Sequence, residues 1–223
     1  MIPEIREKFN AAFTEKKYQD FLKDLDSKHP GSIEFRVAET PVFIPKDFTK
    51  KMIDACEAIV DIITDTKFKA LTQRAIPKNE NVPNENAHTD FIAFDFGICE
   101  SAEGELEPQL IEMQGFPTLF GFQVYYPQVI EKHFEIPGNF SNYLNGYDSD
   151  SYIQFLKEII LGGHQPENVI LLELKPHKQK TRIDFYCTQD YVPIQIVCLK
   201  ELIREGKKLF YEKDGKKIEI KRI

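Results

Sequence analysis

The sequence contains no apolar run that approaches the roughly 18 residues needed to span a bilayer, and its start, MIPEIREKFN, lacks a basic region followed by an apolar one. It also contains no long basic run. Lys and Arg total 29 against 36 Asp and Glu, a formal net charge of -7, so no stretch of chain is suited to neutralise the phosphates of a nucleic acid. We therefore expect a cytoplasmic protein whose partners include neither a membrane nor a nucleic acid.

Cysteine is scarce, and no two cysteines form a Cys-x-x-Cys pair. This spacing argues against a structural zinc site and against a dithiol redox motif. No basic side chain stands beside a cysteine in a pattern that would lower a thiol pKa, which argues against a nucleophilic thiolate. We expect reduced core residues at all four positions: Cys56, Cys99, Cys187 and Cys198.

Hydrophobic residues make up 42% of the chain and aromatic residues 12%, enough for one large core or two small ones. Apolar positions spaced by three and four from Ile2 to about Leu25 predict one amphipathic helix. A helix capped by Asp47 is predicted to reach Thr64. The polar stretch 77–86, with two prolines, predicts an exposed loop. Further predictions are a short extended segment at 33–37 and helices at 67–75, 121–133 and 151–161.

The later half of the chain carries the strand signals. Residues 91–98 and 109–114 read as a hairpin, and Asp214-Gly215 between alternating residues predicts another. The continuous apolar run Val169–Leu172 is typical of a strand buried on both faces, and a helix-like stretch separates it from a second run at 194–197. This order predicts an α/β fold, a layered mixed or parallel sheet flanked by helices. We expect a helical segment, 1–76, that packs on an α/β region, 77–223, as one compact unit.

A candidate metal site lies on the predicted strand Leu110-Ile111-Glu112-Met113-Gln114. Glu112 and Gln114 are two residues apart, so both side chains project from one face of the strand. Mg²⁺ prefers oxygen ligands and is usually held by one or two carboxylates together with substrate phosphates. The spacing alone fits equally well with solvated side chains that cap a turn, so both interpretations stay open at this point.

The order of several short segments adds to this pattern. His88-Thr89-Asp90-Phe91 precedes Glu112-Met113-Gln114, which precedes Phe120-Gly121; the strand at 168–172, Gln179-Lys180-Thr181 and the terminal hairpin follow. This order resembles the circularly permuted ATP-grasp ligases, which include eukaryotic-type glutathione synthetase and the glutathionylspermidine synthases. In that family an Arg-x-Asp-Tyr or related segment precedes a Glu-x-Asn strand, a small-residue loop, a substrate loop and a closing hairpin. The likeness spans roughly residues 33–223 and implies a pre-ATP-grasp-like fold.

The resemblance implies an activity as well. These ligases transfer the γ-phosphoryl group of ATP to a carboxylate, and an amine attacks the resulting acyl phosphate to form an amide, a reaction of EC 6.3 type. The implied cofactors are Mg²⁺ and ATP, and the implied partners are a small-molecule carboxylate and an amine, with a homodimer left open. The implied metal ligands are Glu112 and Gln114, no catalytic residue is assigned, and the implied substrate contacts are His88, Thr118, Gln179 and Thr181.

Two departures from the family pattern affect these assignments. His88 stands where the family has a substrate-binding arginine, and histidine offers no fixed bidentate fork to a carboxylate. Gln114 replaces asparagine, which moves the amide oxygen outward by one methylene. The chain has no G-x-x-x-x-G-K-[ST] or G-x-G-x-x-G motif, and the resemblance implies that the ATP-binding half lies beyond residue 223. We expect this portion alone to be inactive.

Several further charged residues have two open interpretations. A basic cluster after the predicted strand at 169–172 is either a solvated helix start or an anion contact, and contains Lys175, His177, Lys178, Lys180 and Arg182. Asp90 and Asp95 are five residues apart, which predicts opposite faces of a strand and a poor acid/base pair. The rival to the ligase hypothesis is a non-catalytic small-molecule binding or interaction module that keeps the fold without the ATP half.

Overall fold

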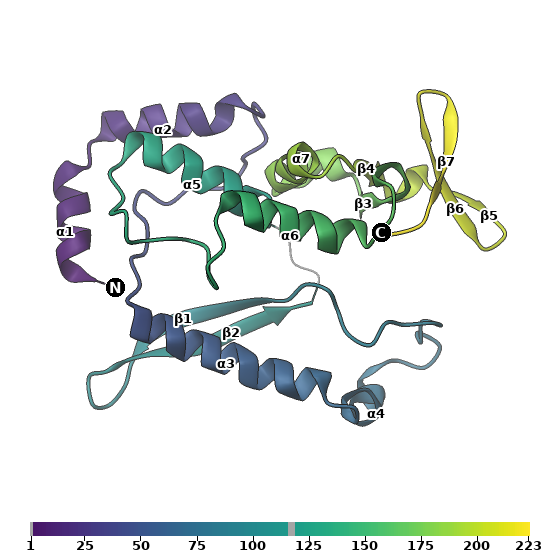
Figure 1. Ribbon diagram of the computed structural model, residues 1–223, viewed down its shortest axis with the longest axis horizontal. Helices are drawn as coiled ribbons and strands as arrows, with labels where there is room; N and C mark the ends of the chain where they lie inside the picture. Colours follow the sequence, from purple (N-terminus) through teal and green to yellow (C-terminus); the bar gives the residue numbers. More distant parts are fainter. Residues whose placement is uncertain (1, 116–118) are drawn as a thin grey trace. The chain divides into compact units, whose positions relative to one another are not determined.

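The computed structural model describes residues 2–115 and 119–223, which fall into two compact units (Figure 1). Unit 1 consists of residues 1–6 and 42–117, and unit 2 of residues 7–41 and 118–223. The boundary expected at 76–77 lies within unit 1. None of the described helices is both long and apolar enough to cross a membrane.

Unit 1 is built from one long helix and one hairpin. Helix α3 (Lys46–Thr64) is followed by α4 (Phe68–Thr72) and the 3₁₀ turn η1 (Gln73–Ala75), and then by β1 (Ala93–Glu100) and β2 (Leu106–Gln114). The strands pair antiparallel, as expected, although β2 begins three residues earlier than predicted. Helix α3 packs on β2, and Lys51 Nζ donates to the Leu106 carbonyl at 3.3 Å.

The β1–β2 hairpin contains an irregularity beside the candidate metal site. Asp95 pairs with Glu112, whereas the next residue, Phe96, pairs with Leu110, so Ile111 is an extra residue with no partner. Such a bulge lets the side chains after it take up a new register against the partner strand. As a result Glu112 and Asp95 stand directly across from each other.

Unit 2 holds most of the helices and two small sheets. After helix α1 (Pro3–Ala12), which begins in unit 1, come α2 (Glu15–Ser27), α5 (Phe122–His133), α6 (Ser149–Leu161) and α7 (Arg182–Tyr191). Helices α2 and α5 lie side by side (Figure 1). The buried side chains between these elements include Phe21, Leu25, Val124, Val129 and Ile183.

The sheets of unit 2 confirm the expected α/β fold. Strands β3 (Ile170–Glu173) and β4 (Gln195–Cys198) pair parallel, with α7 between them in the chain. Strands β5 (Ile203–Glu205), β6 (Lys208–Lys213) and β7 (Lys216–Ile220) form an antiparallel meander whose last turn is Asp214-Gly215, both at positive φ. The 3₁₀ turns η2 (Pro166–Asn168), η3 (Pro176–Lys178) and η4 (Leu199–Glu201) complete the unit.

Two predictions about local structure were wrong. The first amphipathic run is two helices, because the Thr14 hydroxyl accepts from the Lys17 N–H and caps a second helix at Glu15. Helix α3 begins at Lys46 with Pro45 as its cap residue, which places Asp47 in the first turn instead. The segment expected to be extended, 33–37, is not part of a hydrogen-bonded strand, and its extended form stays a prediction.

Cysteine burial differs from the expectation at one position. Cys187 is fully buried and burial raises its thiol pKa to about 12, so it is an unreactive core residue. Cys99 is exposed near the end of β1, where its neighbours Ile98 and Glu100 are exposed as well, so the prediction of four core cysteines was wrong there.

Two residues of α5 fix how this helix packs. Pro127 lies inside the helix and lacks the N–H that would bond the Gln123 carbonyl. The Asn142 side chain donates to that carbonyl at 3.1 Å and replaces the missing bond. At the start of the helix, a Cβ on Gly121 would lie 2.6 Å from the Thr188 backbone nitrogen of α7. Glycine therefore allows close packing between α5 and α7 here.

Candidate functional site

The two predicted metal ligands lie side by side at the end of β2. Glu112 and Gln114 project from the same face, and Gln114 Nε2 donates to Glu112 Oε1 at 2.5 Å. Both side chains are exposed. A rotation of the amide group by half a turn would present the Gln114 oxygen in place of its nitrogen, beside the Glu112 carboxylate.

A third side chain, which sequence reasoning missed, belongs to the same group. Asp95 on β1 stands directly across from Glu112, and residues so paired have Cβ atoms about 5 Å apart on one face. Neither carboxylate forms an ion pair with a described residue. We call Asp95, Glu112 and Gln114 the hairpin acidic patch. Asp95 could have been found from the hairpin register, but the extra residue Ile111 shifts that register in a way that the sequence does not show.

The hairpin acidic patch fits the donor set that Mg²⁺ prefers. It contains two carboxylates and one amide oxygen, all hard ligands, and a protein site with this ligand number leaves positions for water and phosphate. The described residues contain no group of three or more His, Cys, Asp or Glu side chains that could hold a metal ion. A metal here would therefore take part of its coordination shell from outside these side chains.

The segment before β1 is held against the end of β2. The Thr89 hydroxyl donates to the Gly115 carbonyl at 2.5 Å. The neighbouring His88 is exposed, and its Nδ1 lies 3.0 Å from the Thr89 carbonyl oxygen. The structure thus brings the predicted first motif, 88–91, to the same end of the hairpin as Glu112 and Gln114.

The other predicted substrate residues lie in unit 2, in the loop after β3. Gln179 Nε2 donates to the Leu174 carbonyl at 2.8 Å, and Thr181 is the residue before α7. The Lys175 N–H donates to Cys198 Sγ at 3.3 Å, which ties this loop to the end of β4. Gln179 and Thr181 therefore lie at the carboxyl edge of the parallel strands, where open α/β sheets bind ligands. Thr118 lies outside the described residues.

The basic cluster after β3 divides into two kinds of residue. Arg182 forms an ion pair with Glu34 at 2.6 Å and donates to the Gly31 carbonyl, so its guanidinium joins two parts of unit 2. His177 Nδ1 lies 3.0 Å from the Tyr186 hydroxyl. Three exposed lysines of the cluster form no ion pair with a described residue: Lys175, Lys178 and Lys180. The ammonium groups of these lysines could contact an anion.

Comparison with known proteins gives one informative match. No family model matches the chain, and no curated protein matches it. A solved structure, a glutathione synthetase-like effector from Globodera pallida in its apo form, matches with a TM-score of 0.52 at 13% sequence identity. The fold is glutathione synthetase-like. The match covers 91% of this chain and 55% of the effector, so the chain spans about half the length of that protein.

Several carboxylates outside the candidate site have a pKa below the ordinary value, and Asp190 is the one that joins two helices of this glutathione synthetase-like fold. Burial would raise the pKa of Asp190, but hydrogen bonds from Lys28 and His29 outweigh it and hold the pKa below its ordinary value. The ion pair to Lys28 measures 2.7 Å and the contact to His29 Nε2 2.8 Å. These contacts tie the end of α2 to the end of α7, which is a structural role.

Proposed function

We propose that this chain is the pre-ATP-grasp and substrate-binding part of a circularly permuted ATP-grasp ligase, which forms an amide from a carboxylate and an amine through an acyl phosphate. The observation that carries the proposal is the hairpin acidic patch, found in a chain whose fold is glutathione synthetase-like over 91% of its length. Fold alone does not define an activity, so the proposal rests on the residues at the site.

The residues of unit 1 would hold Mg²⁺. Glu112 and Gln114 are the proposed ligands, and Asp95 adds a second carboxylate on the same face. Bound Mg²⁺ would supply positive charge against the phosphates of ATP, whose transfer depends on such neutralisation. Two carboxylates that face each other repel, and a divalent cation between them removes that repulsion.

The residues of unit 2 would contact the substrates. Gln179 and Thr181 lie at the carboxyl edge of β3 and β4, and the exposed lysines Lys175, Lys178 and Lys180 are suited to a carboxylate. His88 in unit 1 and Thr118, which lies outside the described residues, are further proposed substrate contacts. In the reaction, a carboxylate oxygen bonds to the γ-phosphorus as ADP leaves; the amine nitrogen then bonds to the acyl carbon, loses a proton and expels phosphate.

Trapping of the acyl phosphate tests the proposal. The complete gene product is incubated with ATP, Mg²⁺, hydroxylamine and a panel of amino-acid and dipeptide carboxylates, and hydroxamate is measured. We expect hydroxamate that requires ATP and Mg²⁺. In Glu112→Gln its rate should fall about 10- to 100-fold, whereas Glu107→Gln, on the same strand but outside the patch, should keep it. Glu112→Gln with undiminished hydroxamate would remove Glu112 from the site, and no ATP consumption with any carboxylate would favour a non-catalytic binding module.

A further inference from the structure

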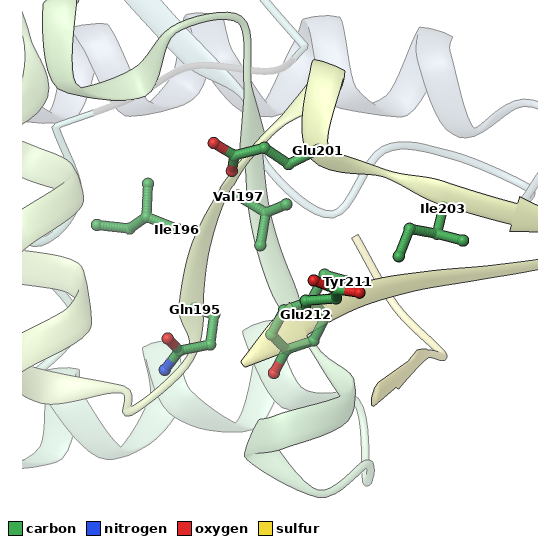
Figure 2. A pocket seen from close by; sticks show the side chains of 7 residues that line it. All are labelled: Gln195, Ile196, Val197, Glu201, Ile203, Tyr211 and Glu212. Carbon is green, nitrogen blue, oxygen red and sulfur yellow. The ribbon is translucent and has the colours of Figure 1, made fainter. Parts of the chain in front are cut away.

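Unit 2 contains a cleft that the proposed ligase reaction does not use. Its volume is about 460 Å³, within the range of small-molecule sites. Strand β4, the turn η4 and strands β5 and β6 line this open cleft (Figure 2). The lining residues are Gln195, Ile196, Val197, Glu201, Ile203, Tyr211 and Glu212.

The floor of the cleft is apolar and firmly packed. Val197 and Tyr211 are each 3% exposed and belong to one core cluster with Ile170 and Ile220. The Tyr211 hydroxyl donates to the Glu167 carbonyl at 2.8 Å, which fixes the ring. A ligand with an apolar body would therefore meet a preformed surface, and the apolar area that it could remove from water is mainly that of the partly exposed Ile203.

Among the residues that the structure describes, the charged ones that line the cleft are Glu201 and Glu212. Local composition does not explain why both charges are negative, because Lys and Arg outnumber Asp and Glu in residues 199–223. In Figure 2 the side chain of Val197 lies between Glu201 and the pair formed by Tyr211 and Glu212. Both charged side chains of the lining are therefore negative.

Both cleft carboxylates are exposed and form no ion pair with a described residue. The other two glutamates of the segment are paired: Glu205 with Lys217, and Glu219 with Lys208 and Lys221. Internal cations thus neutralise the glutamates outside the cleft and leave those inside it without a counter-charge.

The local geometry explains why no lysine neutralises the cleft. Lys217 is the cross-strand partner of Glu212, but its ammonium lies 4.9 Å from the centre of the Phe210 ring and pairs with Glu205. Glu201 Oε2 accepts the Cys198 N–H at 3.1 Å, and Glu201 Oε1 accepts no hydrogen bond from a described residue. A carboxylate oxygen held in this way is available to an external donor.

We propose that this cleft binds a small organic cation, an ammonium group on a short apolar body. The ammonium lies against Glu201 and Glu212, and the apolar body covers Ile203 above the packed floor of Val197 and Tyr211. Charge complementarity selects the cation and the buried floor selects an organic one over a bare metal ion. The proposal is independent of the ligase reaction, because the cleft shares no residue with the proposed metal or substrate sites.

Binding of matched six-carbon probes tests the proposal. Amide resonances of the isotope-labelled 223-residue chain are followed during titration with hexylammonium chloride, 1-hexanol, sodium hexanoate and MgCl₂. We expect hexylammonium to shift resonances of 195–203 and 211–212 in a saturable way. Binding of 1-hexanol should be about tenfold weaker or more, since it lacks both charge contacts, and hexanoate should not bind. Equal binding of the alcohol, or the same shifts with MgCl₂, would overturn the proposal.

Matched variants locate the charge contacts. Glu201→Gln and Glu212→Gln keep side-chain size and remove one charge each, so each should weaken hexylammonium binding about two- to fivefold. Glu103→Gln, in the β1–β2 turn, removes one exposed charge elsewhere and should leave binding unchanged. If the double variant E201Q/E212Q, shown to be folded by its dispersed spectrum, binds hexylammonium as tightly as the original chain, the assignment to this cleft is wrong.

Discussion

Units 1 and 2 differ in where their buried surface lies. Among the described residues, only Phe43 and Phe48 are buried apolar side chains of unit 1, whereas unit 2 contains all the others. An isolated hairpin is marginally stable in water, yet the hairpin of unit 1 carries the hairpin acidic patch. Side-chain packing therefore holds unit 2 together. In unit 1, strand register positions exposed polar groups that have few buried apolar side chains beneath them.

The largest expected effect contrasts one core side chain with one hairpin side chain. Phe21 is 1% exposed and meets Tyr126 and Phe134 edge-on, so Phe21→Ala should lower the free energy of unfolding by about 3–5 kcal/mol. Ile111 is 70% exposed, and Ile111→Ala should stay within about 0.5 kcal/mol of the original chain. Urea unfolding followed by circular dichroism measures both. Similar losses of unfolding free energy in the two variants would contradict the difference in packing between the units.

Glycine substitutions in the two units should also differ in their effect on stability. Gly121→Ala forces a Cβ against α7 and should cost about 1–3 kcal/mol of unfolding free energy. The control is Gly97→Ala on β1, where the nearest atom would lie at 3.7 Å, an ordinary contact. That variant should unfold at nearly the original urea concentration. A neutral Gly121→Ala would show that α5 and α7 do not pack as described.

The replaced hydrogen bond in α5 provides a coupled test. Asn142→Ala leaves the Gln123 carbonyl without its donor and should cost about 1 kcal/mol of unfolding free energy. Pro127→Ala restores a backbone N–H for that carbonyl. In the double variant the loss from Asn142→Ala should shrink, which a double-mutant cycle measures. Additive effects would mean that Asn142 does not compensate for Pro127.

Acid should weaken unit 2 through Asp190. Because hydrogen bonds from Lys28 and His29 hold its pKa below the ordinary 3.8, the stabilisation is fully present above that value and is lost as the pH falls through the folded-state pKa. The original chain should therefore be more stable than Asp190→Asn at pH 7. The difference in unfolding free energy between the two chains should disappear as the pH falls below about 4. Unfolding free energies across this range measure it, and a gap that persists at low pH would contradict the role of the charge.

The smallest expected effect has the opposite sign. Asp95→Asn removes the repulsion between Asp95 and Glu112 and should raise the stability of the chain by about 0.2–1 kcal/mol at low salt. Salt screens exposed charges, so the gain should shrink at high ionic strength. Glu107→Gln, across from Cys99, is the matched control on the same hairpin and should give no gain. Thermal unfolding in the absence of divalent cations measures both variants.

Local sequence signals predicted much of the fold. The apolar run at Val169 and its companion at Ile194 predicted a parallel pair, and Asp214-Gly215 predicted the closing hairpin; both are confirmed. Periodicity did not reveal the break at Thr14, because a cap interrupts a helix without altering its apolar spacing. Nor did it reveal the two units, because unit 1 joins residues far apart in the chain.

The candidate site could also be predicted only in part. The two-residue spacing of Glu112 and Gln114 correctly predicted that they share a face, because alternation is a local property of a strand. The role of Asp95 could not be predicted, because its pairing with Glu112 depends on a bulge that the residue types at these positions do not predict. The roles of His88, Gln179 and Thr181 stay predictions, since each depends on a substrate.

The metal site of the hairpin acidic patch is the central claim, and paramagnetic broadening by Mn²⁺, used in place of Mg²⁺, tests it most directly. We predict that the amide resonances of Asp95, Glu112 and Gln114 broaden at the lowest Mn²⁺ concentrations, and that Glu112→Gln raises the concentration required by about tenfold or more. Broadening centred elsewhere in the chain, or unchanged in Glu112→Gln, would contradict the account.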